Sequence, residues 1–159
     1  MYQRILVPVD GSPTSTRGLA EAISLAKLTG ARLRLINVVD VMLFAMEADA
    51  FAGVASNMIP LMREGGQKIL AIAQAQVEAA GVGVDTVLRD GFAGRVCDLV
   101  IDEAKAWSAE LIVIGTHGRR GAGRLFLGSD AEQILRMASV PVLLVRSAET
   151  GEKQAAPRP

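Results

Sequence analysis

The sequence predicts an α/β fold: an open, parallel, five-stranded sheet with helices on both faces. Short runs of Val, Ile and Leu alternate along the chain with segments whose apolar residues recur at helical spacing. The runs are apolar at nearly every position, which is typical of parallel strands that are buried on both faces. The chain has 159 residues, half of them apolar, which suits a single hydrophobic core. We therefore expect one α/β domain over residues 1–146 and a flexible tail over 147–159.

The first third of the chain supplies two strands and the helix between them. Residues 5–9 form a short apolar run, the first predicted strand. Residues 12–30 predict a helix, because Ser12 and Pro13 suit its first positions and Gly30 suits its end. Residues 32–39 predict the second strand. The apolar residues of 41–62 follow neither period, and we expect short helices in a long connection there.

The rest of the chain alternates in the same way. The predicted segments are a helix over about 62–80 that Gly81 ends, a strand over 82–89, a helix over 96–107, a strand over 111–114, a helix over 129–137 and a strand over 140–145.

This alternation of strands and helices predicts where a ligand would bind. Strands that follow one another through helices lie parallel, with right-handed crossovers. In such sheets ligands bind beyond the carboxyl ends of the strands, where the strand order reverses. The candidate loops begin at Asp10, Val39, Asp90 and Gly115.

Composition excludes several classes of protein. The 17 basic and 17 acidic residues cancel, which argues against a nucleic-acid-binding protein, since these need many Lys and Arg residues at the phosphate backbone. Cys97 is the only cysteine and His117 the only histidine, so neither an internal disulfide nor a structural zinc site is expected. No apolar run is long enough to span a membrane. We expect a cytoplasmic protein.

The loop over residues 115–129 contains five glycines. Glycines let main-chain N–H groups approach an anion closely, and the N-terminus of the following helix adds donors with partial positive charge. Arg119, Arg120 and Arg124 add full charges, so this chemistry favours a phosphate group. The alternative interpretation is an ordinary turn with solvated arginines. The Walker pattern and the dinucleotide pattern GxGxxG are both absent.

The loop glycines follow the spacing G-x2-G-x9-G-S/T. The residues that form it are Gly115, Gly118, Gly128 and Ser129. In this spacing the chain resembles the ATP-binding branch of the universal stress protein family. The resemblance extends to residues 5–12, 35–38 and 140–145, and it covers about residues 3–146 in order.

The resemblance implies a fold and a ligand. The sheet order would be 3-2-1-4-5, so that the order reverses between the first and fourth strands. The ligand would be ATP, with Mg²⁺ bridging its phosphates and no protein ligand to the metal assigned. Asp10 would contact the nucleoside with Pro8 and Val9 alongside, and the Val38 main chain would read the adenine edge. The residues implied at the phosphates are Gly115, Gly118, Gly128 and Ser129, with His117 and Arg119 close by.

Two acidic residues allow more than one interpretation. Asp10 could form only an Asx turn into the following helix, or it could also face the ligand. Ser129 and Glu132 have the form of a capping box. Asp130 between them would repel a triphosphate unless Mg²⁺ bridges the two or the side chain points away. It either stabilises the helix dipole at the surface or contacts phosphate through its main chain.

The leading hypothesis is an ATP-binding universal stress protein that acts as a nucleotide-dependent sensor in a stress response. The alternatives are a slow ATP hydrolase and a nucleotide-free dimeric interaction module. No catalytic residue is assigned, because His117 has no evident carboxylate or nucleophile partner, so any ATPase activity would be weak. The apolar last strand, Val140 to Val145, lies at a sheet edge in the implied order. Relatives dimerise through this strand, and we expect a homodimer.

Overall fold

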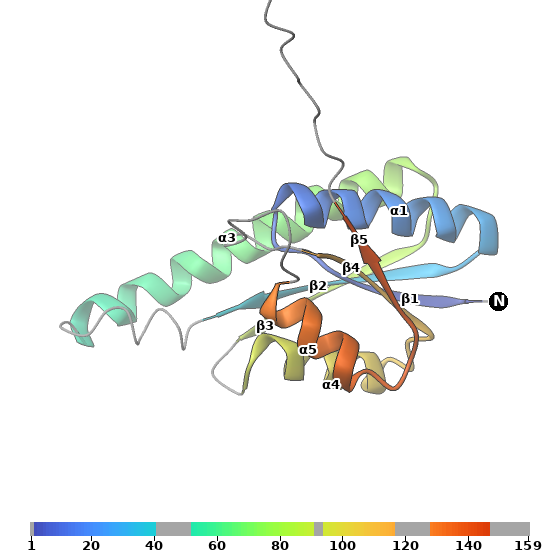
Figure 1. Ribbon diagram of the computed structural model, residues 1–159. Helices are drawn as coiled ribbons and strands as arrows, with labels where there is room; N and C mark the ends of the chain where they lie inside the picture. Colours follow the sequence, from blue (N-terminus) through green and yellow to red (C-terminus); the bar gives the residue numbers. More distant parts are fainter. Residues whose placement is uncertain (1, 41–51, 91–93, 117–127, 147–159) are drawn as a thin grey trace, which may run out of the picture.

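The structure, a computed structural model, describes residues 2–40, 52–90, 94–116 and 128–146. Its sheet consists of five strands: β1 (Arg4–Pro8), β2 (Arg32–Val39), β3 (Val84–Asp90), β4 (Leu111–Gly115) and β5 (Val142–Val145). All neighbouring strands pair in parallel, in the order β3-β2-β1-β4-β5 (Figure 1). The predicted fold class and the strand order that the resemblance implied are therefore confirmed.

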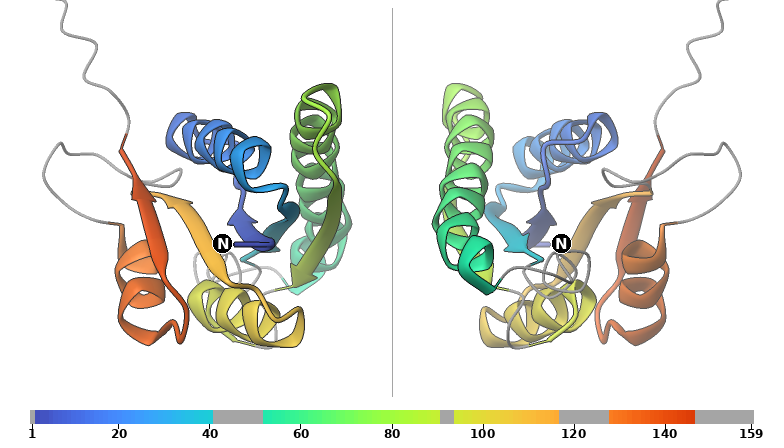
Figure 2. Two further views of the ribbon diagram at one scale, coloured as in Figure 1. Left: turned by 90° about the vertical axis from the view of Figure 1, so that its right-hand side faces the viewer. Right: turned by 90° about the vertical axis from the view of Figure 1, so that its left-hand side faces the viewer.

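Helices cover both faces of the sheet. The four helices within the described residues are α1 (Pro13–Thr29), α3 (Ala52–Ala79), α4 (Val96–Ala106) and α5 (Ser129–Met137). α1 and α3 pack on one face, and α4 and α5 pack on the other (Figure 2). Of these helices, none is long and apolar enough to cross a membrane.

The two helical layers bury opposite sides of the same strands. In β1, Ile5 and Val7 belong to the core under α1 and α3, whereas Leu6 belongs to the core over α4 and α5, and all three are fully buried. Successive side chains of a strand point to opposite faces. A central strand covered on both faces must therefore be apolar at every position, which explains the unbroken apolar runs in the sequence.

The predicted signals at the ends of α1 are confirmed. Ser12 is the N-cap, and its Oγ accepts a hydrogen bond from the main-chain N–H of Ser15 at 3.2 Å. Pro13 follows as the first helical residue. Gly30 ends the helix with φ 72°, in the left-handed region that glycine tolerates best.

α3 differs from its prediction. It begins at Ala52, so the expectation of short helices is wrong for residues 52–61, and residues 41–51 lie outside the described part of the chain. Met58, Met62 and Ile69 recur at helical spacing and line a cavity. Pro60 lies inside the helix on its exposed side, where it interrupts the helical sequence pattern without ending the helix.

Two strands begin later than predicted. The N–H of Val82 donates to the carbonyl of Val77 at 3.2 Å, so this residue still takes part in the turn that closes α3. β3 starts only at Val84. Similarly, β5 starts at Val142 because it follows Pro141, which has no N–H to give to a ladder.

An ion cluster around the buried Glu103 joins α4 to β2 and β3. The Glu103 side chain is only 3% exposed and accepts from Arg34 Nη1 at 2.8 Å and from Arg89 Nη2 at 2.5 Å. Arg34 also pairs with Asp85 at 2.6 Å and stacks over the Trp107 ring. Burial alone would raise the pKa of Glu103, but the hydrogen bonds and positive charges of the two arginines outweigh it and lower this pKa.

We predict that Glu103→Gln lowers the free energy of unfolding by about 2 kcal/mol at neutral pH, because it leaves two guanidinium groups without their shared carboxylate. A carboxylate with a lowered pKa stabilises the fold above its unfolded pKa and loses that effect as the pH falls through its folded pKa. The difference between wild type and variant therefore shrinks below about pH 4.

Urea unfolding of both proteins at several pH values measures this difference. Glu64→Gln is the control, since the Glu64 side chain is 55% exposed and pairs with Lys68 one turn away, and we expect almost no change. A Glu103→Gln difference that is as large at pH 3 as at pH 7 would contradict the role of the carboxylate charge.

Candidate functional site

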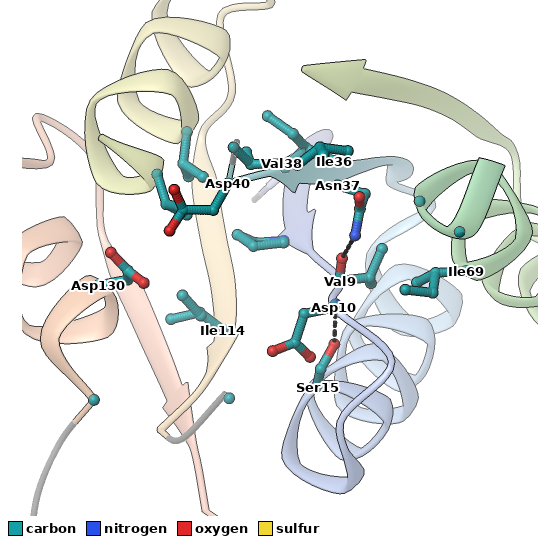
Figure 3. A pocket seen from close by; sticks show the side chains of 18 of the residues that line it. Val9, Asp10, Ser15, Ile36, Asn37, Val38, Asp40, Ile69, Ile114 and Asp130 are labelled. Atoms are coloured by element: carbon teal, nitrogen blue, oxygen red, sulfur yellow. Dashed lines mark hydrogen bonds between the residues drawn. The ribbon is translucent and has the colours of Figure 1, made fainter. Parts of the chain in front are cut away.

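A cavity of about 710 Å³ lies at the carboxyl ends of β1, β2 and β4 (Figure 3). β1 pairs with β2 on one side and with β4 on the other, so the chain leaves β1 where the strand order reverses. Residues 58–69 of α3 and the first two turns of α4 and α5 complete the wall. The cavity therefore lies at the crevice in which parallel sheets bind ligands, and its volume suits a small-molecule ligand.

The wall combines apolar side chains with a few polar ones. Apolar residues from every bounding element line it, including Ile36, Val38, Met62, Ile69, Val96 and Ile114. The polar side chains among its described lining residues are Asp10, Ser15, Asn37, Asp40, Ser129 and Asp130. An apolar slot with a small number of placed polar groups is the common composition of a ligand site.

Asp10 follows β1 and forms the expected Asx turn. Its Oδ1 accepts from the N–H of Ser12 at 2.8 Å, and its own N–H donates to Ser15 Oγ at 3.1 Å. Gly11 between them has φ 78°. The Asp10 side chain also lines the cavity (Figure 3). The two interpretations of Asp10 are thus compatible, and its contact with a ligand stays a prediction.

β2 extends further than β1 at this edge. The last residue of β1, Pro8, is level with Ile36, while β2 continues to Val39. The carbonyl of Ile36 accepts from Val9 on the β1 side at 2.8 Å. Because main-chain groups alternate along a parallel ladder, the N–H and C=O of Val38 also turn toward that side, where β1 has already ended. Val38 lines the cavity at this point.

Asn37 is a residue that the sequence analysis did not identify. It is 5% exposed, and its Nδ2 donates to the Val9 carbonyl at 2.7 Å. A Cβ on Gly66 of α3 would lie 2.5 Å from Asn37 Oδ1, so the absence of a side chain there lets α3 approach. Asn37 thereby holds together the ends of β1 and β2 beneath the cavity. The available signal was a polar residue within a buried strand.

Gly115, at the end of β4, has a packing role that is independent of any ligand. A Cβ at this position would lie 2.6 Å from the carbonyl oxygen of Thr14 and 3.0 Å from the nitrogen of Ser15. The end of β4 therefore touches the first turn of α1 backbone to backbone. Gly18 lets α1 come close at the same place, since its Cβ would lie 3.2 Å from the Gly115 nitrogen.

The N-terminus of α5 corrects the capping-box prediction. Gly128 is the N-cap, and no side chain caps the helix there within the described residues. Ser129 is already helical, and Glu132 pairs with Arg136 at 3.7 Å instead of reaching back. The first N–H groups of a helix have no acceptors within the helix, and here the first residues line the cavity. The N–H of Gly128 itself donates to the Thr116 carbonyl at 2.8 Å.

Asp130 and Asp40 reach into the cavity from opposite elements. Asp130 lies in the first turn of α5, and Asp40 directly follows β2. The two carboxylates point toward each other in Figure 3, and both line the cavity. Asp130 thus combines the predicted place at the positive end of the helix dipole with a place in the cavity wall. Asp40 was not predicted as a site residue, although it lies in the candidate loop that begins at Val39.

The structure brings eight of the eleven predicted site residues to one cavity. They are Pro8, Val9, Asp10, Val38, Gly115, Gly128, Ser129 and Asp130. The other three, His117, Gly118 and Arg119, lie outside the described residues. Within the described part of the chain, no group of three or more His, Cys, Asp or Glu residues is arranged to hold a metal ion.

Known proteins share both the sequence pattern and the fold. Residues 1–146 match the model of the universal stress protein family. A universal stress protein of Methanocaldococcus jannaschii is 34% identical over 147 residues, which cover 92% of this chain and 83% of the relative. The crystal structure of a protein from the universal stress protein family from Burkholderia pseudomallei has 33% identity and a TM-score of 0.75, with 92% and 97% of the two chains covered.

Two similar structures are nucleotide complexes. A universal stress protein in complex with cAMP has 28% identity and a TM-score of 0.64, covering 92% of this chain and 98% of its own. A universal stress protein from Archaeoglobus fulgidus in complex with dAMP has 21% identity and a TM-score of 0.65, covering 91% and 98%. At that identity the second likeness shows the shared fold.

We predict that Gly115→Ala lowers the free energy of unfolding by about 1 to 3 kcal/mol, because the new Cβ forces β4 and α1 apart. Thermal or urea unfolding without added ligand measures the effect. Gly65→Ala is the matched control: this glycine also lines the cavity, but a Cβ there meets no atom within 4 Å. In a helix that change should leave stability equal or raise it by up to about 1 kcal/mol. Equal stability of the two variants would contradict the packing role of Gly115.

Proposed function

Because the chain belongs to the universal stress protein family, we propose that its cavity binds ATP and that the protein is a nucleotide-dependent regulatory module in a stress response. The observation that carries this proposal is the cavity itself. It has an apolar slot with main-chain groups at one end and the N-terminus of α5 at the other.

The β2 end of the cavity suits an adenine ring. A flat aromatic base needs apolar surfaces on its faces and a donor beside an acceptor on its edge. Val38 offers both main-chain groups beyond the end of β1, and the side chains of Met62, Ile69 and Val96 supply apolar surface. Recognition by main-chain groups depends on strand register and not on side-chain identity. Substitutions of the Val38 side chain should therefore leave this hydrogen bonding in place.

The α5 end suits phosphate groups. Gly128 and Ser129 place the first turn of α5 at the cavity, where main-chain N–H groups and the helix dipole attract anions. Gly115 faces them from the end of β4. The motif residues His117, Gly118 and Arg119 would complete the phosphate site, with Mg²⁺ neutralising part of the triphosphate charge.

Two kinds of observation support different parts of the proposal. The complex of a family member with cAMP supports an adenine nucleotide as the class of ligand. The choice of ATP over other adenine nucleotides rests on the glycine spacing that ends in Gly128 and Ser129. The role in a stress response rests on membership of the family.

We predict that the protein, denatured after purification, releases adenine nucleotide, or that the emptied protein binds ATP with Mg²⁺ in calorimetry. Asp10→Ala should lower the affinity for ATP about tenfold, because the carboxylate that would accept hydrogen bonds from the ribose hydroxyls is lost. Asp10→Asn is the matched variant. Its amide oxygen can still accept from the Ser12 N–H that Asp10 now holds, so it preserves the turn while removing the charge.

Asp10→Asn should therefore keep the melting temperature of wild type and bind ATP with intermediate affinity. If wild type carries no nucleotide and gives no binding heat with ATP and Mg²⁺, the proposal is wrong. The ratio of ATP to ADP among the released nucleotides separates a sensor from a slow hydrolase.

We also propose that two copies pair through β5. This strand ends the sheet order, so it pairs with β4 on one side alone among the described strands. The carbonyls of Pro141 and Val145 face β4, and by the alternation of the ladder the main-chain groups of Val142 and Leu144 face outward. An apolar edge with outward donors and acceptors favours pairing with a second strand.

We predict a mass of twice the 16.8 kDa chain in light scattering at micromolar concentration. Leu144→Pro removes an outward N–H without removing a β4-facing one and should shift the mass to a single chain. Circular dichroism checks that the variant stays folded. A single-chain mass for wild type would contradict the proposed dimer.

A further inference from the structure

We propose that Asp130 selects the charge of the ligand: it lowers the affinity of the cavity for metal-free triphosphate relative to monophosphate. This inference rests on the nucleotide binding proposed above and adds a specificity-determining residue to it. It predicts that the preference of the cavity for AMP over ATP is larger without a divalent cation than with one.

Asp130 lies beside the main-chain groups that would bind phosphate. It is the second residue of α5, next to Ser129 and two residues from the N-cap Gly128. All three residues line the same cavity, and the Asp130 carboxylate is on the cavity side of the helix (Figure 3). Its negative charge therefore lies within one turn of the main-chain N–H groups that would face phosphate.

The charged side chains in the described cavity wall are acidic. The described lining residues include three carboxylates, those of Asp10, Asp40 and Asp130, and no Lys, Arg or His. Asp40 points toward Asp130 (Figure 3). The described wall is thus acidic, and each further negative charge on a ligand raises its repulsion from this wall.

The direction of the effect does not depend on the basic residues of the glycine-rich loop. Arg119, Arg120 and Arg124 bring positive charge to this part of the sequence. Removing one carboxylate raises the local potential whether Asp130 repels the phosphates directly or neutralises a neighbouring arginine. In both cases the ligand with more negative charges gains more.

The size of the effect follows from charge differences. ATP without metal carries about two more negative charges than AMP. In water-like surroundings each of these charges, near one carboxylate, changes affinity by a factor of a few, so the ratio of the two affinities should change about tenfold. Mg²⁺ cancels about two charges of ATP and should remove most of that difference.

The experiment measures the affinities of emptied wild type and Asp130→Asn for AMP and ATP by calorimetry, with Mg²⁺ and with EDTA. In EDTA, Asp130→Asn should raise the ATP-to-AMP affinity ratio about tenfold, and added salt should shrink this change. With Mg²⁺ the change should fall below about threefold. Glu132→Gln is the matched control, since it removes the same charge two residues further along α5, where Glu132 pairs with Arg136 and does not line the cavity.

Asp130→Ser is the second variant, since serine is also well tolerated near a helix N-terminus, and it keeps the test valid if the asparagine variant unfolds. An unchanged ATP-to-AMP ratio in both variants, with AMP still bound, would overturn the role of Asp130 and leave the proposed function intact. The same shift in Glu132→Gln would also overturn it, because a general change in the helix dipole would then explain the effect. Failure of wild type to bind either nucleotide would overturn the proposed function and this inference together.

Discussion

The central strand β1 ends three residues before β2, and the arrangement of the site depends on this difference in length. Because β1 stops at Pro8 while β2 continues to Val39, the main-chain groups of Val38 on the β1 side face the cavity instead of a paired strand. The chain leaves β1 through the Asx turn of Asp10 and enters α1. A longer β1 would pair with Val38 and fill the crevice, so the cavity results from strand lengths before any side chain takes part.

Close backbone contacts then fix the walls around that gap. Gly115 lets β4 meet α1 at Thr14, and Gly66 lets α3 approach Asn37. Asn37 in turn donates a hydrogen bond to the Val9 carbonyl at the end of β1. A buried acceptor of this kind needs such a donor. Two glycines therefore act as packing positions here. A glycine in a sequence motif has a structural reason to be present even when a ligand approaches it, and stability measurements without ligand separate the two reasons.

Local signals made most of the fold predictable, and tertiary placement explains what was missed. Both ends of α1 were predicted because Ser12 and Gly30 cap the helix through contacts with residues only three or four positions away. The start of α3 was missed because its apolar stripe near Met62 faces a cavity and gives only a weak pattern. Asn37 and Asp40 were missed because lining a cavity depends on neighbours distant in sequence. The capping-box prediction was wrong because α5 begins one residue earlier than that motif requires, so that Gly128 and not Ser129 is the N-cap.

The distribution of charge shows why a glycine motif alone does not define the ligand. The net charge of zero hides two different arrangements of acidic groups. Glu103 is buried, pairs with Arg34 and Arg89, and is not part of the cavity wall, so it contributes to stability. Asp40 and Asp130 instead reach into the cavity, so their field acts on whatever binds there. In the proposed nucleotide site, main-chain N–H groups at a helix N-terminus can donate to any phosphate group. Side chains such as Asp40 and Asp130 would therefore supply the discrimination among nucleotides.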